Sequence, residues 1–318
     1  MSRSAATISF RLLGAVLTIL VGAFAVFMVM KTAPGDPALV VLGEQAPPEA
    51  VAAFHARYHL DAPVLEQFWF WFSQAARGNF GRSLTIAGGT SISGLIGARL
   101  PNTIFIGLYG LTLAVIVSLV MGVIAALRRG RAADTVATSI AVLGISMPDF
   151  WLSYVLIFAL ALGAGWFPSY GFVPPGQSLT GALYSGFLPA LAISAPMAAV
   201  FARTLRAALI DVSHREFITV ARSFGFAEFF IFLQFVFRNA LIPYVTVIGL
   251  QVRYLLGGVV VIERIFGIPG LGSLMVDSAF GRDYPVVQAC AITFLAIVLG
   301  VNLLVDLVCT FLDPRRSH

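Results

Sequence analysis

Charged residues are scarce in this chain of 318 residues, and lysine is almost absent. Only 11% of the residues are charged, whereas 59% are apolar, and the mean hydropathy is +0.92. Because soluble domains carry about a quarter charged residues, this composition indicates a membrane protein. Every basic residue except Lys31 is arginine. No basic cluster is interleaved with polar surface and aromatics, which argues against nucleic-acid binding.

Catalytic and nucleotide-binding motifs are missing as well. The four histidines lie at 55, 59, 214 and 318, outside the apolar runs, and neither G-x-S-x-G nor H-E-x-x-H occurs. A membrane enzyme would need a nucleophile, metal ligands or an acid–base pair, so we expect no catalytic residue. A P-loop requires Lys after Gly, but Lys31 follows Met30. The chain therefore cannot hydrolyse ATP by itself.

We expect neither a disulfide between the two cysteines nor a metal site at the paired histidines. Cys290 and Cys309 lie in one apolar run, where nineteen residues of helix would separate them by ~28 Å, too far for a disulfide. His55 and His59 are four residues apart and could share a metal. Without acidic or cysteine companions, one solvated helix face is the better interpretation. We expect no metal site and no cofactor bound by this chain.

Long apolar runs predict an all-α membrane protein with six transmembrane helices. The runs cover residues 12–30, 100–127, 134–162, 187–202, 239–262 and 284–305. About twenty apolar residues cross a bilayer as a helix. The third run is broken by Pro148-Asp149, and the fifth is interrupted by Arg253. The first run is longer than the apolar part of a signal peptide and no A-x-A site follows it, so we expect it to be retained.

Counting arginines predicts the orientation. With the N-terminus inside, the inner segments hold twelve of the twenty basic residues, and the outer segments hold fewer over far more chain. The positive-inside rule then predicts that both termini are cytoplasmic. We expect four parts: 1–31, the cytoplasmic N-terminus and first span; 32–100, an extracytoplasmic segment with amphipathic helices; 101–312, a core of five spans; and 313–318, a cytoplasmic tail.

The extracytoplasmic segment is expected to contain two helices. Pro47-Pro48-Glu49 favours a helix that runs through His59, and Pro63 favours a second helix that ends before Gly78. The second helix carries five consecutive aromatic residues, Phe68 to Phe72. Aromatics at this density beside a membrane are typical of an interfacial belt. A platform for an aromatic ligand is the alternative.

The segment Ser213–Gly225 lies in a basic gap between two spans. Ser213 and Glu216 form an S-x-x-E capping box, so we expect a helix to begin there and to end at Gly225. Its apolar residues fall on one face, namely Phe217, Ile218, Ala221 and Phe224. Its polar residues fall on another, namely Arg215, Thr219, Arg222 and Ser223. So short a helix is marginal in water and must dock against something.

Two ionisable residues lie inside predicted spans. Asp149 and Arg253 each lie fifteen residues beyond a charge at the inner end of their run, which is ~22 Å along a straight helix. A charge in the bilayer costs a few kcal/mol unless it faces a partner or water. We hypothesise that both residues line a transport pathway, and that they form an ion pair there. A purely structural pair between helices is an equal alternative.

Several strings resemble ABC-transporter permeases of the dipeptide/oligopeptide/nickel import group. In the C-terminal half they are residues 216–225, Arg238–Pro243, Gly257–Glu263, Phe266–Gly272, Arg282–Gln288 and Asp313–Arg315. Upstream they are Pro34–Pro37, Gly78–Ser83, Arg99–Thr103 and Ser146–Trp151. The resemblance covers essentially the whole chain, and the large segment after the first span resembles the B-type subunit.

This resemblance implies a type I ABC importer permease fold in the inner membrane of a bacterium. It implies four kinds of partner: a C-type permease, two ATPase subunits that hold ATP and Mg, an extracytoplasmic solute-binding protein, and membrane lipid. Loop 207–238 would be the cytoplasmic coupling loop. Its helix would dock on an ATPase subunit through Ser213, Arg215, Glu216, Phe217, Thr219, Ala221, Arg222 and Gly225.

The chain departs from the family pattern at two places. The family loop carries E-A-A-x-x-x-G; Ala221 and Gly225 match it, but Thr219 and Val220 occupy the first two positions. Asp149 and Arg253 stand where the family has small or neutral residues. The implied substrates are di- or oligopeptides, with nickel chelates, glutathione or sugar derivatives as alternatives.

Two other classes of transporter remain as alternatives. An ion-coupled secondary transporter would need carboxylates in the membrane, and Asp149 and Asp306 are the candidates. A passive channel would need a selectivity ring, which the sequence does not reveal. Co-purification with an ATPase subunit would separate both from an ABC permease.

Overall fold

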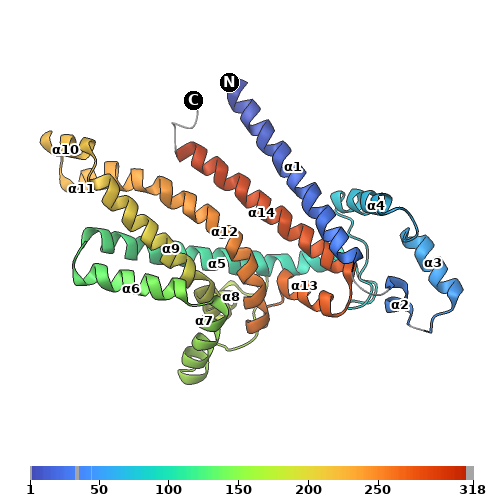
Figure 1. Ribbon diagram of the computed structural model, residues 1–318. Helices are drawn as coiled ribbons and strands as arrows, with labels where there is room; N and C mark the ends of the chain where they lie inside the picture. Colours follow the sequence, from blue (N-terminus) through green and yellow to red (C-terminus); the bar gives the residue numbers. More distant parts are fainter. Residues whose placement is uncertain (1, 33–35, 44, 313–318) are drawn as a thin grey trace. The chain divides into compact units, whose positions relative to one another are not determined.

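The computed structural model describes residues 2–32, 36–43 and 45–312, apart from the side chains of 2–13, 15, 37, 40, 253, 256 and 306–312. Every element named in these residues is a helix (Figure 1). The predicted all-α class is therefore confirmed. The first eight elements are α1 Ser2–Lys31, α2 Pro37–Leu42, α3 Pro48–Tyr58, α4 Val64–Ala76, α5 Ile92–Leu127, α6 Ala132–Ser146, α7 Asp149–Leu156 and the π-helix η1 Ile157–Gly163. The others are α8 Leu179–Ser185, α9 Phe187–Ser213, α10 Glu216–Ser223, α11 Glu228–Ile231, the π-helix η2 Phe232–Phe237, α12 Arg238–Phe266, α13 Leu271–Phe280 and α14 Tyr284–Leu312.

Between four and six helical segments of the described chain are long and apolar enough to cross a membrane. Four do so alone: Ile92–Leu127, Phe187–Ser213, Glu228–Val252 and Tyr284–Val305. Two further pairs, α6 with α7–η1 and the end of α12 with α13, each qualify as one broken span. The first predicted span, 12–30, lies within α1, and the part of this helix with described side chains, Val16–Lys31, is apolar. The predicted tail 313–318 lies outside the described residues.

The predicted break at Pro148 is confirmed. α6 ends at Ser146, and the chain turns by 107° before the next helix begins at Asp149. Met147 and Pro148 are both extended, because proline disfavours a helical residue before it and offers no N–H of its own. Arg253, by contrast, does not interrupt the backbone of α12, which is helical throughout Arg238–Phe266.

The chain forms two compact units. Unit 1 comprises Met1–Pro101 and Pro269–Leu299, and unit 2 comprises Asn102–Ile268 and Gly300–His318. In unit 1, α4 packs on α1: the Phe68 ring lies 5.1 Å from that of Phe24 and 5.7 Å from that of Phe27. Phe68 is only 3% exposed, whereas Trp69 and Phe70 of the same aromatic run are 53% and 48% exposed. Phe68, one of the five aromatic residues expected to form an interfacial belt, therefore belongs to the core of unit 1.

A buried carboxylate in unit 1 binds the loop of residues 83–86. Asp283 precedes α14 and is fully buried, and its Oδ2 accepts four hydrogen bonds from residues 83–86. The donors are Ser83 Oγ at 2.6 Å and the amides of Leu84, Thr85 and Ile86 at 3.0, 3.0 and 3.3 Å. Successive amides converge on one oxygen because the loop forms a concave nest of N–H groups.

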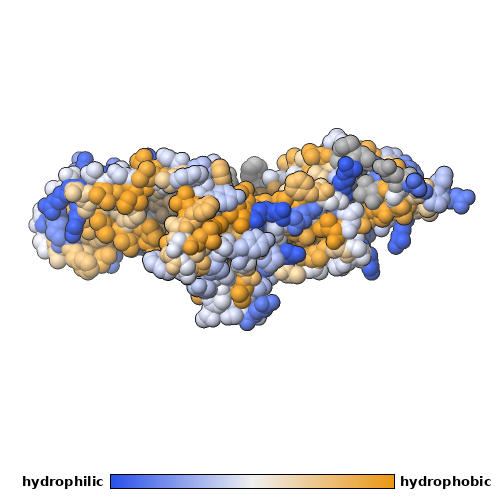
Figure 2. All heavy atoms as spheres, turned by 90° about the horizontal axis from the view of Figure 1, so that it is seen from below, coloured by the Kyte–Doolittle hydropathy of each residue, from blue (hydrophilic) through white to orange (hydrophobic). Residues whose placement is uncertain are grey.

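Unit 2 is built around α9. Most of this helix is buried, and glycines let its neighbours approach it closely. A Cβ on Gly122 of α5 would meet the carbonyl of Ala202 at 3.0 Å, and one on Gly144 of α6 would meet that of Ala195 at 3.2 Å. Small residues at such contacts are typical of membrane helix packing. On the face drawn in Figure 2, apolar side chains cover much of the surface between hydrophilic areas.

Candidate functional site

The loop between α9 and α12 folds into a compact pair of short helices. α10 and α11 lie beyond the ends of α9 and α12, at one end of unit 2 (Figure 1). The π-helix η2 then joins α11 to α12 without a break. Ile218, Ala221 and Ile231 are buried in the same apolar cluster as α9 and α12. The short helices are therefore held by the core of unit 2, which an isolated helix of eight residues would need.

The predicted capping box at the start of α10 is wrong. Ser213 is the last residue of α9, and its hydroxyl donates to the carbonyl of Leu209. The N-cap of α10 is Arg215, which is extended and makes no side-chain cap bond. Because α9 is still helical at Ser213, that residue cannot adopt the extended conformation of an N-cap. Glu216 lies in the first turn, where its charge suits the helix dipole.

The predicted end of α10 at Gly225 is confirmed. Gly225 has φ +79°, the left-handed conformation that favours glycine. Its amide donates to the Arg222 carbonyl at 2.9 Å, and the Phe226 amide donates to that of Ala221 at 3.4 Å. These two bonds are those of a Schellman motif. Arg222 then bridges to Glu228 at the start of α11 through bonds of 2.8 and 3.2 Å, which raises the pKa of Arg222 above its ordinary value.

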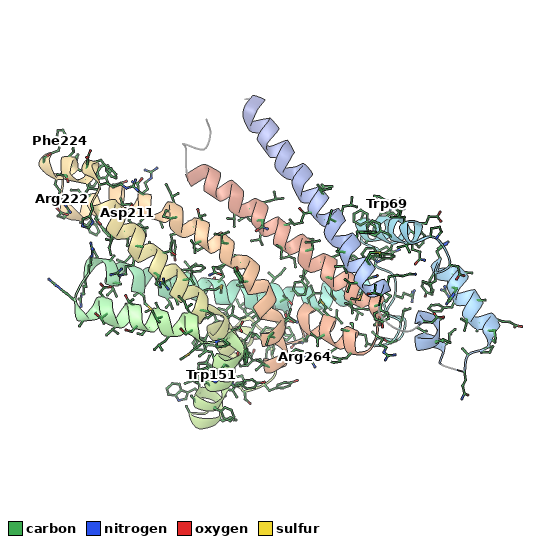
Figure 3. All side chains as sticks on the ribbon, in the orientation of Figure 1. Trp69, Trp151, Asp211, Arg222, Phe224 and Arg264 are labelled. Carbon is green, nitrogen blue, oxygen red and sulfur yellow. The ribbon has the colours of Figure 1, made fainter. Side chains whose placement is uncertain are left out.

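The single apolar face expected for α10 is divided in the structure. Ile218 and Ala221 are 0% and 7% exposed. Phe217 and Phe224 are 41% and 76% exposed, and Phe224 lies at the tip of the loop (Figure 3). Val220 adds a further exposed apolar side chain at 51%. Among the polar residues, Thr219 is exposed and Arg215 pairs with Asp211 at 2.9 Å. Uncovered apolar groups of this size mark an interaction surface.

An ion pair that the sequence analysis did not identify joins α6 to α9 near this loop. Arg206 donates to Asp134 through two bonds of 2.6 and 2.8 Å, and the Gly130 amide adds a third at 2.9 Å. The carboxylate is nearly buried, with 9% of its side chain exposed. Both residues are charges at the ends of apolar runs, but the 72 residues between them leave no local signal. This bidentate pair fixes the spacing of the two helices.

The two pathway candidates lie on facing elements of unit 2, but their pairing is untested. Asp149 is the first residue of α7, and its Oδ1 accepts from the Phe150 amide at 2.9 Å. Its Oδ2 lies 2.6 Å from where a Cβ on Gly258 would be, so Asp149 reaches α12 five residues beyond Arg253. The side chains of Arg253 and Asp306 lie outside the described residues.

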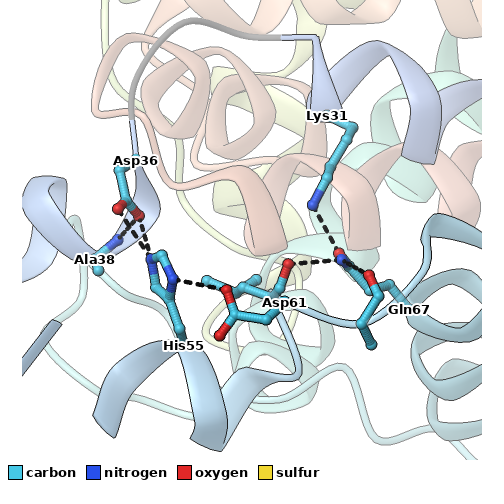
Figure 4. A network of polar contacts seen from close by, with 8 residues as sticks. Lys31, Asp36, Ala38, His55, Asp61 and Gln67 are labelled. Carbon is cyan, nitrogen blue, oxygen red and sulfur yellow. Dashed lines mark hydrogen bonds and ion pairs between the residues drawn. The ribbon is translucent and has the colours of Figure 1, made fainter. Parts of the chain in front are cut away.

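A polar network in unit 1 links α1, α2, α3 and α4 (Figure 4). Lys31 donates to Gln67 at 2.8 Å, and Gln67 in turn holds the carbonyls of Leu60 and Ala62. His55 lies between two carboxylates: Nε2 is 2.9 Å from Asp36, and Nδ1 is 3.2 Å from Asp61. The network ties the end of the first apolar helix to the segment that follows it.

His55 therefore has the acidic companions that the sequence analysis did not find, and it is not simply a solvated residue. Hydrogen bonding to Asp36, helped by Asp61, raises the pKa of His55. Burial acts to raise the pKa of Asp36, but the bonds from His55 and the Ala38 amide outweigh it and lower that pKa. The carboxylates lie on opposite sides of the ring, and His59 instead ends α3 in a left-handed conformation. No metal cluster of three such ligands occurs in the described residues.

Comparison with known families identifies the class of protein. Residues 118–318 match the family described as binding-protein-dependent transport system inner membrane component. Residues 6–104 match the N-terminal family of such membrane components. The chain therefore belongs to this family. It is a multi-pass inner-membrane permease subunit of an ABC importer, it is not itself catalytic, and its partners are an ATPase and a binding protein.

Individual relatives support the same conclusion along the whole chain. A Brucella abortus (strain 2308) permease, provisionally named for peptide transport, is 37% identical over 308 residues, 97% of this chain and 98% of that protein. The glutathione transport system permease protein GsiC of Escherichia coli (strain K12) is 36% identical over 97% of both chains. The inward-facing MetNI methionine ABC transporter shares the fold, with a TM-score of 0.56 at 17% identity, over 69% of this chain and 97% of that one. The predicted type I importer fold is confirmed.

Proposed function

We propose that this chain is the B-type permease of a binding-protein-dependent peptide importer. It forms half of the translocation pathway with a second, C-type permease, and two ATPase subunits bind ATP and Mg. The names of its relatives support peptides as the substrate class. The same machinery carrying glutathione is the second candidate, favoured by the similarity to GsiC. Nickel chelates or sugar derivatives are further alternatives that the ligand of the binding protein would reveal.

The observation that carries this proposal is the form of the α10 loop. We place it, and both chain termini, in the cytoplasm because the inner segments then hold most of the arginines. There α10 acts as the coupling helix and presents Phe217, Val220 and Phe224 to a groove of an ATPase subunit. Buried Ile218 and Ala221 fasten its other side to unit 2. Closure of the ATPase dimer on ATP then moves α9 and α12, which alternates access to the pathway.

A coupling helix must be held rigidly on the permease. If it moved freely, closure of the ATPase dimer would not change the relative free energies of the two permease conformations. The Schellman turn at Gly225 and the Arg222–Glu228 pair hold α10 against α11. We also assign Asp149 and Arg253 to the translocation pathway. Asp149 begins α7 and Arg253 lies in the middle of α12, two helices that face each other.

Substitution of Gly225 tests the role of the loop. A Cβ at Gly225 would have nothing within 4 Å, so Gly225→Val acts through backbone strain alone, about 1–2 kcal/mol for a side chain in the left-handed region. We expect the assembled importer to hydrolyse ATP but to import less substrate per ATP in proteoliposomes. Gly225→Asn, which tolerates this conformation, should retain coupling.

Gly130 provides the matched control. It has φ +74° in the turn between α5 and α6 and equally open space, so Gly130→Val introduces the same strain at the same end of unit 2. It should leave the ratio of import to hydrolysis close to that of the wild type. Normal import by Gly225→Val in an assembled complex would refute the assignment of α10 as the coupling helix.

A further inference from the structure

Arg203 is distinguished from the other charged residues in the C-terminal half of α9. Arg206 is bound by Asp134, and Asp211 pairs with Arg215. Arg203 is exposed, and it makes no hydrogen bond or ion pair with another residue that the structure describes. It lies directly after the apolar run 187–202 and ten residues before the end of α9, or ~15 Å along the helix axis. An arginine at the end of an apolar run can bind an anion or extend to water along its long side chain.

The side chain lines a groove between α6, α9 and α12. α6 and α9 touch where Gly144 meets Ala195, and the Asp134–Arg206 pair bridges them nearer the α10 end. An open groove of about 840 Å³ runs along α9 here, and its lining includes Thr138, Arg203, Thr204, Arg206, Asp211 and Pro243. A second cavity of about 610 Å³ shares Thr138 and Arg206 with it. Both are open grooves, and their volumes fall within the range of small-molecule sites.

The chemistry of the groove separates it from the lipid-facing surface. Val136 and Ile140 on α6 are 56% and 52% exposed, as expected of residues that face acyl chains. The groove instead combines Arg203 with two threonine hydroxyls. Two further charged residues line it, but each is already paired: Arg206 with Asp134, and Asp211 with Arg215. Thr204 donates its hydroxyl proton to the Val200 carbonyl at 3.0 Å, so its oxygen keeps lone pairs that can accept an N–H. The groove thus offers a strong donor and a nearby acceptor.

We propose that this groove is a carboxylate-binding subsite of the translocation pathway. Arg203 binds the C-terminal carboxylate of a peptide, and Thr204 accepts from a peptide amide. An arginine fork matches a carboxylate with two parallel hydrogen bonds. Every linear peptide carries that carboxylate whatever its side chains, so the subsite reads the backbone and not the sequence. This inference rests on the proposed function of the chain in peptide import.

Binding to the nucleotide-free complex of both permeases and both ATPases tests the subsite. The binding protein is left out because it has its own specificity. The probes are labelled alanyl-alanine and alanyl-alanine amide, which lacks the carboxylate charge. We expect the wild type to bind the free acid about tenfold more tightly than the amide, as for loss of one charge-assisted interaction. Arg203→Gln should abolish this preference, and Arg203→Lys should retain part of it.

Arg129→Gln is the matched control, since Arg129 is exposed in the turn between α5 and α6 and lines neither cavity. It should keep the preference for the acid. An unchanged preference in Arg203→Gln overturns the proposal, as does a wild type that imports alanyl-alanine but does not distinguish it from the amide. Loss of bound phosphatidylglycerol from Arg203→Gln in native mass spectrometry, with peptide binding unchanged, would assign Arg203 to lipid and also overturn it. Failure of the complete wild-type importer to take up any peptide would instead contradict the proposed function.

Discussion

Replacement of Asp283 should open one loop of unit 1 while most of the fold remains. Its Oδ2 accepts four hydrogen bonds from residues 83–86, and the carboxylate is fully buried. Asp283→Ala leaves a hydroxyl and three amides without their acceptor. Each buried donor left unsatisfied costs about 1–3 kcal/mol, and these four share one oxygen and do not add. We expect a loss of about 3–5 kcal/mol, more than for one unsatisfied donor and less than the sum of four.

Hydrogen exchange of the Leu84, Thr85 and Ile86 amides measures this loss directly. A loss of that size corresponds to exchange about a hundredfold to several thousandfold faster, since 1.36 kcal/mol is a factor of ten. Asp283→Asn keeps an acceptor oxygen and loses the charge, so we expect about a tenfold effect. Glu66→Gln, which removes an exposed carboxylate from α4 of the same unit, should change nothing. If Asp283→Ala left these amides exchanging within twofold of the wild type, the carboxylate would not be what holds the loop.

Two further perturbations test the other polar sites. The pKa of His55 is raised, so the stability that His55 contributes is fully present below its ordinary pKa of about 6.5. That contribution is lost as the pH rises through the raised pKa. Hydrogen exchange across residues 36–61 should therefore increase at alkaline pH. His55→Asn should remove that transition, and an unchanged pH profile in this variant would contradict it. Arg206→Gln should lower the midpoint of thermal unfolding, because it leaves the Asp134 carboxylate without its cation. The double exchange Asp134→Arg with Arg206→Asp should recover part of that loss, and a double variant no more stable than the single one would argue against the pair.

Helix breaks and helix ends that depend on a few adjacent residues were predictable from the sequence. Pro148 breaks a span because its effect on the preceding residue is local, and Gly225 ends α10 because glycine alone enters the left-handed region freely. The capping box failed for a related reason. Ser213 and Glu216 have the right spacing, but whether Ser213 can cap depends on where the preceding helix ends, and α9 continues through it.

Features that depend on distant residues were not predictable. The Asp134–Arg206 pair spans 72 residues, and the nest around Asp283 spans almost two hundred. Hydrophobic periodicity identifies which runs are helical, but it does not say which helices pack together. His55 shows the same limit at shorter range, because Asp36 lies nineteen residues away on another element. The split of the apolar face of α10 likewise reflects its packing on unit 2 and not its own pattern.

The nest around Asp283 also has a consequence for how the protein is made. Its amide donors at 84–86 and its acceptor are separated by 197 to 199 residues of chain, and most of unit 2 is encoded between them. At about 5–20 residues per second, a ribosome needs roughly 10–40 seconds to cover that interval. The first part of unit 1 must therefore remain incomplete while the intervening spans are inserted. A nascent chain arrested before Asp283 should expose residues 83–86 to a protease that no longer reaches them in the finished protein.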